Sequence, residues 1–250
     1  MSPAPEKSAP PADPAVANDY DSFAEAYSAE NESSLLNAYY DRPAMLALAG
    51  DVAGRRVLDA GCGSGPLYAA LRDRGAVVTG FDKSAGMLAL ARRRLGAGAD
   101  LQVADLGGPL PFPDSTFDDV VASLVLHYLE DWGPPLAELR RVLKPGGRLI
   151  VSVEHPFAVT LMHREAGRKA DYFATYNYTV EWTAGGQSAV LRFWTRPLYA
   201  MTGAFTAAGF RITVISEPAV APDTPSELLP DGIGDGRRFL CFLFFVLHAS

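Results

Sequence analysis

The stretch Val57-Leu-Asp-Ala-Gly-Cys-Gly-Ser-Gly65 decides the fold of this chain. A short apolar run, typical of a buried strand, leads into Asp59, and three glycines follow at every second position. Glycine has no Cβ, so the backbone can turn sharply there and another group can lie against the main chain at the start of a helix. The spacing is G-x-G-x-G with Pro66 next, whereas a dinucleotide-binding loop reads G-x-G-x-x-G. The stretch therefore predicts a strand, a binding turn and a helix.

Short apolar runs alternate with helical stretches after this turn, which is the pattern of βαβ units. Because the runs lack strict alternation of apolar and polar residues, we expect strands that are covered on both faces. The predicted strands are residues 76–81, 101–104, 117–124, 148–153, 210–215 and 239–247, and the predicted helices are 66–74, 85–95, 134–143 and 197–208. Residues 179–183 and 189–194, on either side of Gly185-Gly186, predict a β-hairpin.

The chain divides by composition into three parts. Residues 1–17 are rich in proline and have no apolar run, which predicts a disordered tail. Residues 18–52 predict a helical cap, since Tyr20 and Tyr27 recur on one helix face. Residues 53–250 predict one α/β domain.

Composition narrows the class of function. The 250 residues are 48% hydrophobic and carry a formal net charge of −7, which repels nucleic acid backbones. The two cysteines, Cys62 and Cys241, have neither disulfide-framework nor metal-site spacing, so we expect no metal and a reducing, cytoplasmic environment. The longest apolar run, residues 239–247, is far shorter than the ~20 residues that a membrane-spanning helix needs. We expect a monomer or homodimer that binds neither nucleic acid nor membrane.

Three acidic residues end three consecutive predicted strands: Asp59, Asp82 and Asp105. Parallel strands end at one edge of a sheet, so these side chains should converge on one crevice. A carboxylate at Asp82 can accept hydrogen bonds from ribose hydroxyls, and Asp105 can reach an adenine amino group. The alternative is that each is a turn or helix-capping aspartate.

The motifs resemble those of class I S-adenosylmethionine (SAM)-dependent methyltransferases of the type 11 branch. The resemblance rests on V-L-D-A-G-C-G-S-G, T-G-F-D-K-S, L-P-F-P-D-S-T-F-D and L-K-P-G-G-R-L, and it extends from about Tyr20 to Val153. It implies SAM as cofactor and a seven-stranded, mostly parallel Rossmann-like sheet with helices on both faces and a reversed last strand. In layout the chain is also similar to bacterial indole C3-methyltransferases.

The same resemblance assigns residues to the cofactor. Asp59, Gly61 and Gly63 would flank its methionine part, and a tyrosine of the N-terminal helices would close over it. Asp82 would hold the ribose, and the adenine would lie beside the residues that follow the third strand. The full expected set is Tyr20, Tyr27, Asp59, Gly61, Cys62, Gly63, Asp82, Lys83, Met87, Asp105, Leu106 and Leu124.

Candidates for the catalytic proton acceptor follow the fourth and fifth strands, which face the methyl group. The sulfonium makes that methyl electrophilic, so the chain has to align a nucleophile, exclude water and take up a proton. The candidates are His127, Glu154 and His155, with Tyr176 added from the region that follows. Neighbours on a strand point to opposite faces, so only one of Glu154 and His155 is expected to face the pocket. For His127 the alternative is structural packing, and His163 is expected on the surface.

An aromatic-rich insertion at about residues 157–198 is expected to bind the acceptor. Its aromatic residues can form core between hairpin and sheet, or a lid in which Tyr176, Tyr178, Trp182 or Trp194 stacks on a flat substrate. The first hypothesis is methyl transfer to a small aromatic or heteroaromatic acceptor, at indole C3 or a phenol oxygen, in natural-product biosynthesis. The alternatives are an NAD(P)-dependent oxidoreductase and a SAM-binding protein without catalysis.

Overall fold

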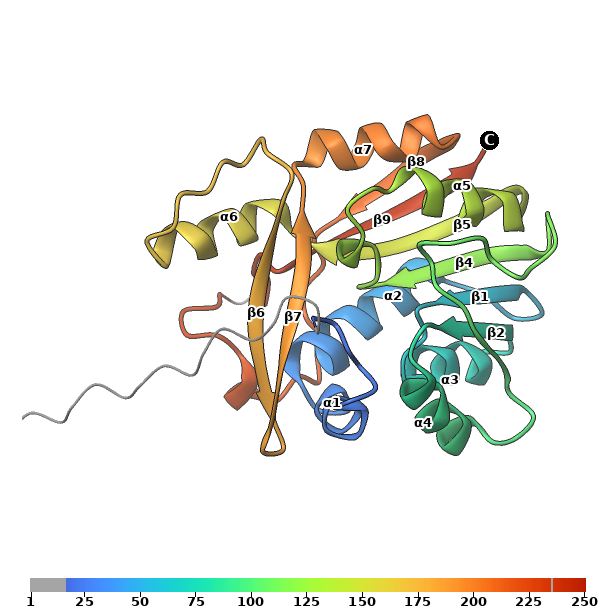
Figure 1. Ribbon diagram of the computed structural model, residues 1–250, viewed down its shortest axis with the longest axis horizontal. Coiled ribbons are helices and arrows are strands. Elements are labelled where there is room, and N and C mark those ends of the chain that lie inside the picture. The colour runs from blue at the N-terminus through green and yellow to red at the C-terminus, as the bar shows by residue number, and fades with distance from the viewer. Residues whose placement is uncertain (1–16, 235) are drawn as a thin grey trace, which may run out of the picture.

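A computed structural model describes residues 17–234 and 236–250 of the chain (Figure 1). The predicted disordered tail, residues 1–17, lies outside this range except for Ala17. The main sheet contains β1 (Arg56–Ala60), β2 (Val77–Asp82), β3 (Asp100–Val103), β4 (Phe117–Ser123), β5 (Leu143–Glu154), β8 (Phe210–Ser216) and β9 (Phe242–Ala249). The longer helices are α1 (Ala24–Asn31), α2 (Arg42–Ala49), α3 (Pro66–Asp73), α4 (Ala85–Leu95), α5 (Gly133–Val142), α6 (Pro156–Glu165) and α7 (Leu198–Ala207).

The strand order is β3-β2-β1-β4-β5-β9-β8. Strands β1 to β5 pair in parallel, whereas β9 runs antiparallel between β5 and β8. The seven-stranded sheet with a reversed last strand is therefore confirmed. The chain moves outward in one direction from β1 to β3 and in the other from β4, so the carboxyl ends of β1 and β4 form the switch point where such sheets bind ligands.

Helices cover both faces of the sheet, as the apolar strands predicted. Val57 and its neighbour Leu58 point to opposite faces and are both fully buried. Leu58 packs in a core with residues of α5 and α7, and Val57 packs in a second core with residues of α2, α3 and α4. Burial of apolar surface in each core stabilises the fold by roughly 25 cal/mol per Å². Together the two cores fix the strand ends that carry the site.

Most predicted boundaries differ from the structure by only a few residues. The largest difference is β5, which was expected from Arg148 and begins at Leu143, because Leu143 pairs with Phe117 before the Pro-Gly-Gly turn. The ladder then shifts register and resumes with Arg148 opposite Asp119. A turn predicted to separate helix and strand therefore lies inside the strand, as an irregularity.

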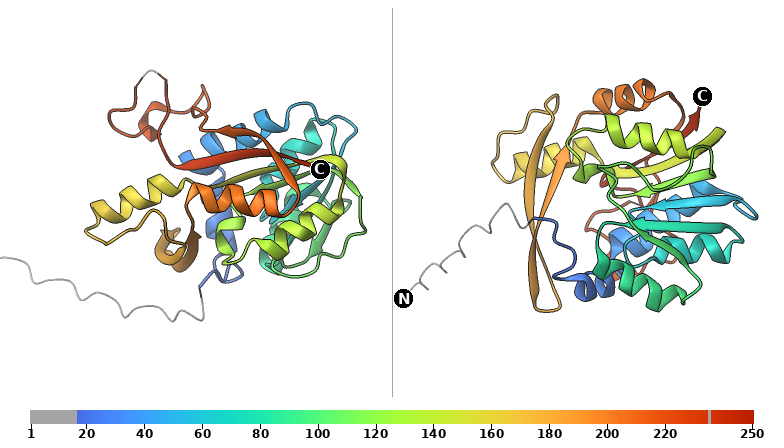
Figure 2. Two further views of the ribbon diagram at one scale, coloured as in Figure 1. Left: turned by 90° about the horizontal axis from the view of Figure 1, so that it is seen from above. Right: turned by 45° about the vertical axis from the view of Figure 1, so that its right-hand side comes forward.

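The predicted hairpin is confirmed and is longer than expected: β6 spans Tyr176–Ala184 and β7 spans Gln187–Thr195. It forms its own two-stranded sheet, which reaches from the α6 and α7 end of the molecule down beside α1 (Figures 1 and 2). Asn18 fixes the N-terminal segment to it, since its backbone N–H donates to the Val190 carbonyl at 3.0 Å and its side-chain amide donates to the Arg192 carbonyl at 3.0 Å.

The region predicted as a helical cap, residues 18–52, contains α1, a π-helical segment at Leu35–Asp41 (η2) and α2. Its division from the rest of the chain as a domain stays a prediction. Within the described residues, no helix has the length and apolar character to cross a membrane.

Candidate functional site

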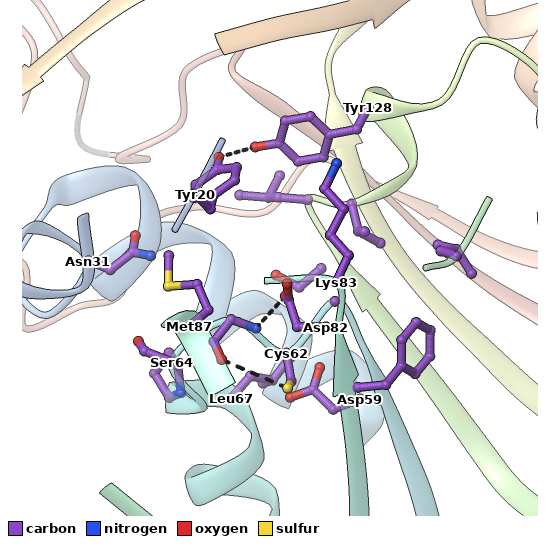
Figure 3. Close-up of a pocket in the computed structure, with 18 of the residues that line it drawn as sticks. Tyr20, Asn31, Asp59, Cys62, Ser64, Leu67, Asp82, Lys83, Met87 and Tyr128 are labelled. Atoms are coloured by element: carbon purple, nitrogen blue, oxygen red, sulfur yellow. Dashed lines mark hydrogen bonds between the residues drawn. The ribbon is translucent and has the colours of Figure 1, made fainter. Parts of the chain in front are cut away.

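A pocket lies at the carboxyl ends of β1, β2 and β4, under the N-terminal segment (Figure 3). The loops after these strands line one side, and residues of α1 and η2 line the other. All of the residues predicted around the cofactor line this pocket: Tyr20, Tyr27, Asp59, Gly61, Cys62, Gly63, Asp82, Lys83, Met87, Asp105, Leu106 and Leu124. Their convergence supports one binding site, while the contact of each with a cofactor stays a prediction.

The glycine turn between β1 and α3 forms the floor of the pocket. Gly61 has φ +73°, and a Cβ there would lie 2.7 Å from Cγ2 of Val125, so both the backbone and the space require glycine. Gly63 has φ +54°, but a Cβ there would meet nothing within 4 Å. The main chain at Gly63 therefore borders open space, where a ligand can lie against the backbone.

Asp82 is held in place by two backbone donors. Its Oδ2 accepts from the Gly63 N–H and its Oδ1 from the Ser84 N–H, each at 2.9 Å. Each carboxylate oxygen can accept further hydrogen bonds, so two neighbouring hydroxyls of a ribose could bind to it. Burial raises the pKa of Asp82, although these backbone hydrogen bonds act in the opposite direction.

Asp59 and Asp105 differ in their surroundings. Asp59 is 1% exposed, and its Oδ2 has no hydrogen-bond partner among the described residues. Burial, and secondarily the charge of Asp82, raises the pKa of Asp59 to about 7. Asp105 is exposed and accepts from the Gly107 N–H at 2.8 Å, as a turn aspartate does, while it also lines the pocket.

These features fit SAM. The orphaned Asp59 oxygen needs a donor, the open space at Gly63 leaves room for the amino-acid chain of a sulfonium, and buried Leu106 offers an apolar surface for a base. The fold and this site define the class I SAM-dependent methyltransferase fold, and SAM is the cofactor that they imply.

Comparison with known proteins leads to the same class. Residues 58–151 match the family described as a methyltransferase domain, and we identify this segment as such a domain. A demethylmenaquinone methyltransferase of Tropheryma whipplei (strain Twist) is 38% identical over 140 residues, which cover 55% of this chain and 58% of the relative. The ubiquinone/menaquinone biosynthesis C-methyltransferase UbiE of Desulfotalea psychrophila is 42% identical over 123 residues, covering 48% of this chain and 49% of the relative.

Among solved structures, an S-adenosylmethionine-dependent methyltransferase from Mesorhizobium loti is 26% identical, with a TM-score of 0.58. The match covers 82% of this chain and 96% of that one, so it extends well beyond the methyltransferase domain. The chain spans only about half the length of the curated relatives. The hairpin lies outside residues 58–151, the segment that matches the family, so it has to be interpreted from its own contacts.

None of the four predicted catalytic residues lines the pocket. Glu154, at the end of β5, has a buried carboxylate oxygen that is free to accept. Its Oε1 accepts from the Tyr178 hydroxyl at 2.6 Å, while its Oε2 is buried without a partner among the described residues. Burial raises the pKa of Glu154 to about 7, against the effect of the Tyr178 hydrogen bond. A carboxyl group with a pKa near neutrality is suited to accept a proton.

The two predicted catalytic histidines have structural surroundings. His155 caps α6, since its Nδ1 accepts from the Phe157 N–H at 3.2 Å, and its Nε2 bonds Glu217 at 2.8 Å. Both of its ring nitrogens are therefore engaged away from the pocket. His127 is buried against the rings of Tyr128 and Phe193, and burial lowers its pKa to about 3. The ring is therefore neutral at neutral pH, and its Nδ1 has no hydrogen-bond partner among the described residues, so both the packing role and the catalytic role of His127 stay predictions.

Tyr176 bonds to His163 rather than facing the pocket, with 3.0 Å between its hydroxyl and Nδ1. His163 is 4% exposed, so its predicted surface position is wrong. The buried side chains of α6 include Val159, Thr160 and His163, which recur at helical spacing on one face. The hairpin covers this face through Tyr176 and Tyr178, and sequence periodicity within the helix could not reveal that cover.

A row of aromatic side chains connects the pocket with Glu154. The hydroxyls of Tyr20 and Tyr128 bond to each other at the side of the pocket opposite Asp59 (Figure 3). The ring of Tyr128 lies 5.3 Å from that of Phe193, which lies 5.8 Å from that of Tyr178, the partner of Glu154. We call Tyr20, Tyr128, Phe193 and Tyr178 the aromatic wall.

The sequence interpretation missed Tyr128 and Asp41, which both line the pocket. Tyr128 follows the fourth strand by five residues in a 3-10 turn, close to the chosen His127. Asp41 lies between buried Tyr40 and a buried helix face, so a charged residue in an apolar helical pattern was the available signal.

Proposed function

We propose that the chain is a SAM-dependent methyltransferase for a small, flat-ring acceptor, with Glu154 as the proton acceptor. One observation carries the proposal: a buried carboxyl with a free oxygen lies at the end of the aromatic wall that begins at the glycine-turn pocket. A strand-end carboxyl that is buried and half satisfied is costly to the fold, so a role at the reacting group accounts for it.

When bound, SAM supplies an electrophilic methyl group. The chain contributes the rest. Tyr178 donates to Oε1 and so fixes the Glu154 carboxylate, with Oε2 left to accept the proton of the nucleophile. Transfer of that methyl group to the acceptor would release a proton from the acceptor, and Glu154 would take it up at Oε2. The aromatic wall keeps water from this path.

The contacts of the hairpin support a flat, apolar acceptor. Tyr178 bonds to Glu154 and Phe193 lies against Tyr178, so two uncharged rings adjoin this carboxyl group. One relative is named a demethylmenaquinone methyltransferase, and another is named a ubiquinone/menaquinone biosynthesis C-methyltransferase. Methylation of a ring carbon, of an indole C3 position or of a phenol oxygen each releases a proton from the acceptor. Glu154 would take up the proton in all three cases. A role in natural-product biosynthesis is part of this proposal.

Calorimetry and a transfer assay test the proposal in two steps. The purified chain should bind SAM and S-adenosylhomocysteine and leave NAD unbound, which separates it from the nicotinamide oxidoreductase alternative. Labelled SAM is then offered with a panel of reduced quinones, indoles and phenols, and label should enter at least one ring compound. Binding without transfer to any member would instead support the SAM-binding protein without catalysis, and binding of NAD alone would overturn the assignment.

A further inference from the structure

Asp41 is a buried acid that the proposed reaction does not use. It is 4% exposed, it lines the pocket, and it ends the π-helical segment η2. Its Oδ2 accepts from the Ser123 hydroxyl at 2.5 Å, while its Oδ1 has no hydrogen-bond partner within the described part of the chain. π-Helical turns are rare and occur often at functional sites. The segment here directs a carboxylate to the end of β4.

A second buried carboxylate, at the end of β1, lines the same pocket. Asp59 is also nine-tenths buried or more, also lines the pocket and also has one oxygen without a partner. The two acids are close enough for the charge of Asp41 to contribute to the raised pKa of Asp59. The guanidinium of Arg42 does not fill the gap, since its Nη2 donates to the Asn31 carbonyl at 2.9 Å.

Two half-satisfied buried carboxylates select a cation with several N–H donors. An anionic group would be repelled, and an apolar group would leave both oxygens without donors. Within SAM, the ribose and adenine belong with Asp82 and Asp105 on the β2 and β3 side, and the sulfonium has no hydrogen to donate. The α-ammonium carries both a positive charge and three donors.

We propose that Asp41 binds the α-ammonium of the amino-acid part of the cofactor, with Asp59 beside it. The inference rests on the proposed function for the presence of SAM, and it adds a residue from the N-terminal cap that the glycine motif does not contain. Because Ser123 holds one oxygen of Asp41, the other is fixed in position before the cofactor arrives. The cap is thereby a part of the cofactor site as well as its cover.

Two adenosyl ligands that differ only at this end test the inference by calorimetry. S-adenosylhomocysteine contains the amino-acid part, and 5′-methylthioadenosine lacks it. Asp41→Asn should weaken binding of S-adenosylhomocysteine by roughly 10- to 100-fold, the usual effect of losing a hydrogen bond to a charged group, and leave 5′-methylthioadenosine unchanged. Asp82→Ala is the matched control, and it should weaken both ligands by the same factor because both contain the ribose.

A measurement on the unmodified chain keeps the test independent of variant folding. An analogue of S-adenosylhomocysteine without the α-amino group should bind as weakly to the wild type as S-adenosylhomocysteine binds to Asp41→Asn. Equal binding of the analogue and the parent, or an equal loss of both adenosyl ligands in Asp41→Asn, would overturn the inference and leave the proposed function standing. Failure of the wild type to bind either adenosyl ligand would instead overturn the proposed function.

Discussion

The two sides of the site are built in different ways. The cofactor side is formed by consecutive strand ends and one turn, where φ angles and the absence of a Cβ determine the shape, as at Gly61. The acceptor side is assembled from Glu154 and the hairpin and joins the cofactor pocket at Tyr20 and Tyr128. These elements are far apart in the sequence and meet only through packing. Backbone geometry is therefore readable from a short motif, while a wall of side chains depends on how distant elements dock.

The largest expected effect lies on the acceptor side. Glu154→Gln keeps the shape and removes the base, so we expect kcat for methyl transfer to fall by roughly 10²- to 10⁴-fold, while the Kd for S-adenosylhomocysteine stays the same. Glu181→Gln, an exposed position on β6, is the control and should change neither. If Glu154→Gln also lost affinity for S-adenosylhomocysteine, the cofactor side and the acceptor side would not be independent of each other.

A backbone substitution should affect the cofactor side alone. Gly61→Ala places a Cβ against Val125 at a positive φ, and such strain costs of order 1–3 kcal/mol, so cofactor affinity should fall by roughly 10- to 100-fold. Gly146→Ala has the same strain, at φ +74°, with open space around the new Cβ and a position outside the pocket. It should lower Tm without changing the Kd for S-adenosylhomocysteine. Equal Kd values for the two variants would mean that the turn does not form the cofactor floor.

The pH dependence of the rate gives a third difference between the sides. Burial raises the pKa of Glu154 to about 7, and only its ionised form can accept a proton. The value of kcat/KM should therefore fall by about tenfold for each pH unit below 7 and level off above it. In Glu154→Gln this acidic limb should disappear from the residual rate. A limb that persists in the variant would assign the titration to another group.

The difference between backbone geometry and side-chain packing also explains which parts of the fold and of the site could be predicted from the sequence. The strands and the acids Asp59 and Asp82 followed from local patterns, because a parallel sheet brings its strand ends to one edge, while the reversed last strand followed from the family resemblance. Glu154 was identifiable as a strand-end acid, but its partner Tyr178 lies across a hairpin whose docking no local rule fixes. His163 was misplaced for that reason.

The smallest expected effect concerns the joint between the two sides. The Trp182 ring of the hairpin lies 5.1 Å from that of Phe23 and 5.7 Å from that of Tyr27, and its Nε1–H donates to Glu30 at 2.6 Å. Aromatic pairs contribute about 0.5–1.5 kcal/mol, and loss of these pairs should loosen the helix that carries Tyr27. We therefore expect Trp182→Ala to weaken binding of S-adenosylhomocysteine about 2- to 10-fold.

The same variant should also raise the KM for the acceptor, because β6 and the aromatic wall belong to one hairpin. Tyr199→Ala serves as control, since that ring is 63% exposed and lies on α7 outside the pocket, and it should change neither constant. If Trp182→Ala changed only the acceptor KM, the N-terminal helix would hold the cofactor without help from the hairpin, and the boundary between the sides would run between these two elements. If both the Kd for S-adenosylhomocysteine and the KM for the acceptor change, the contact of Trp182 with Phe23 and Tyr27 belongs to both sides of the site. Binding of the cofactor would then order the surface that receives the acceptor.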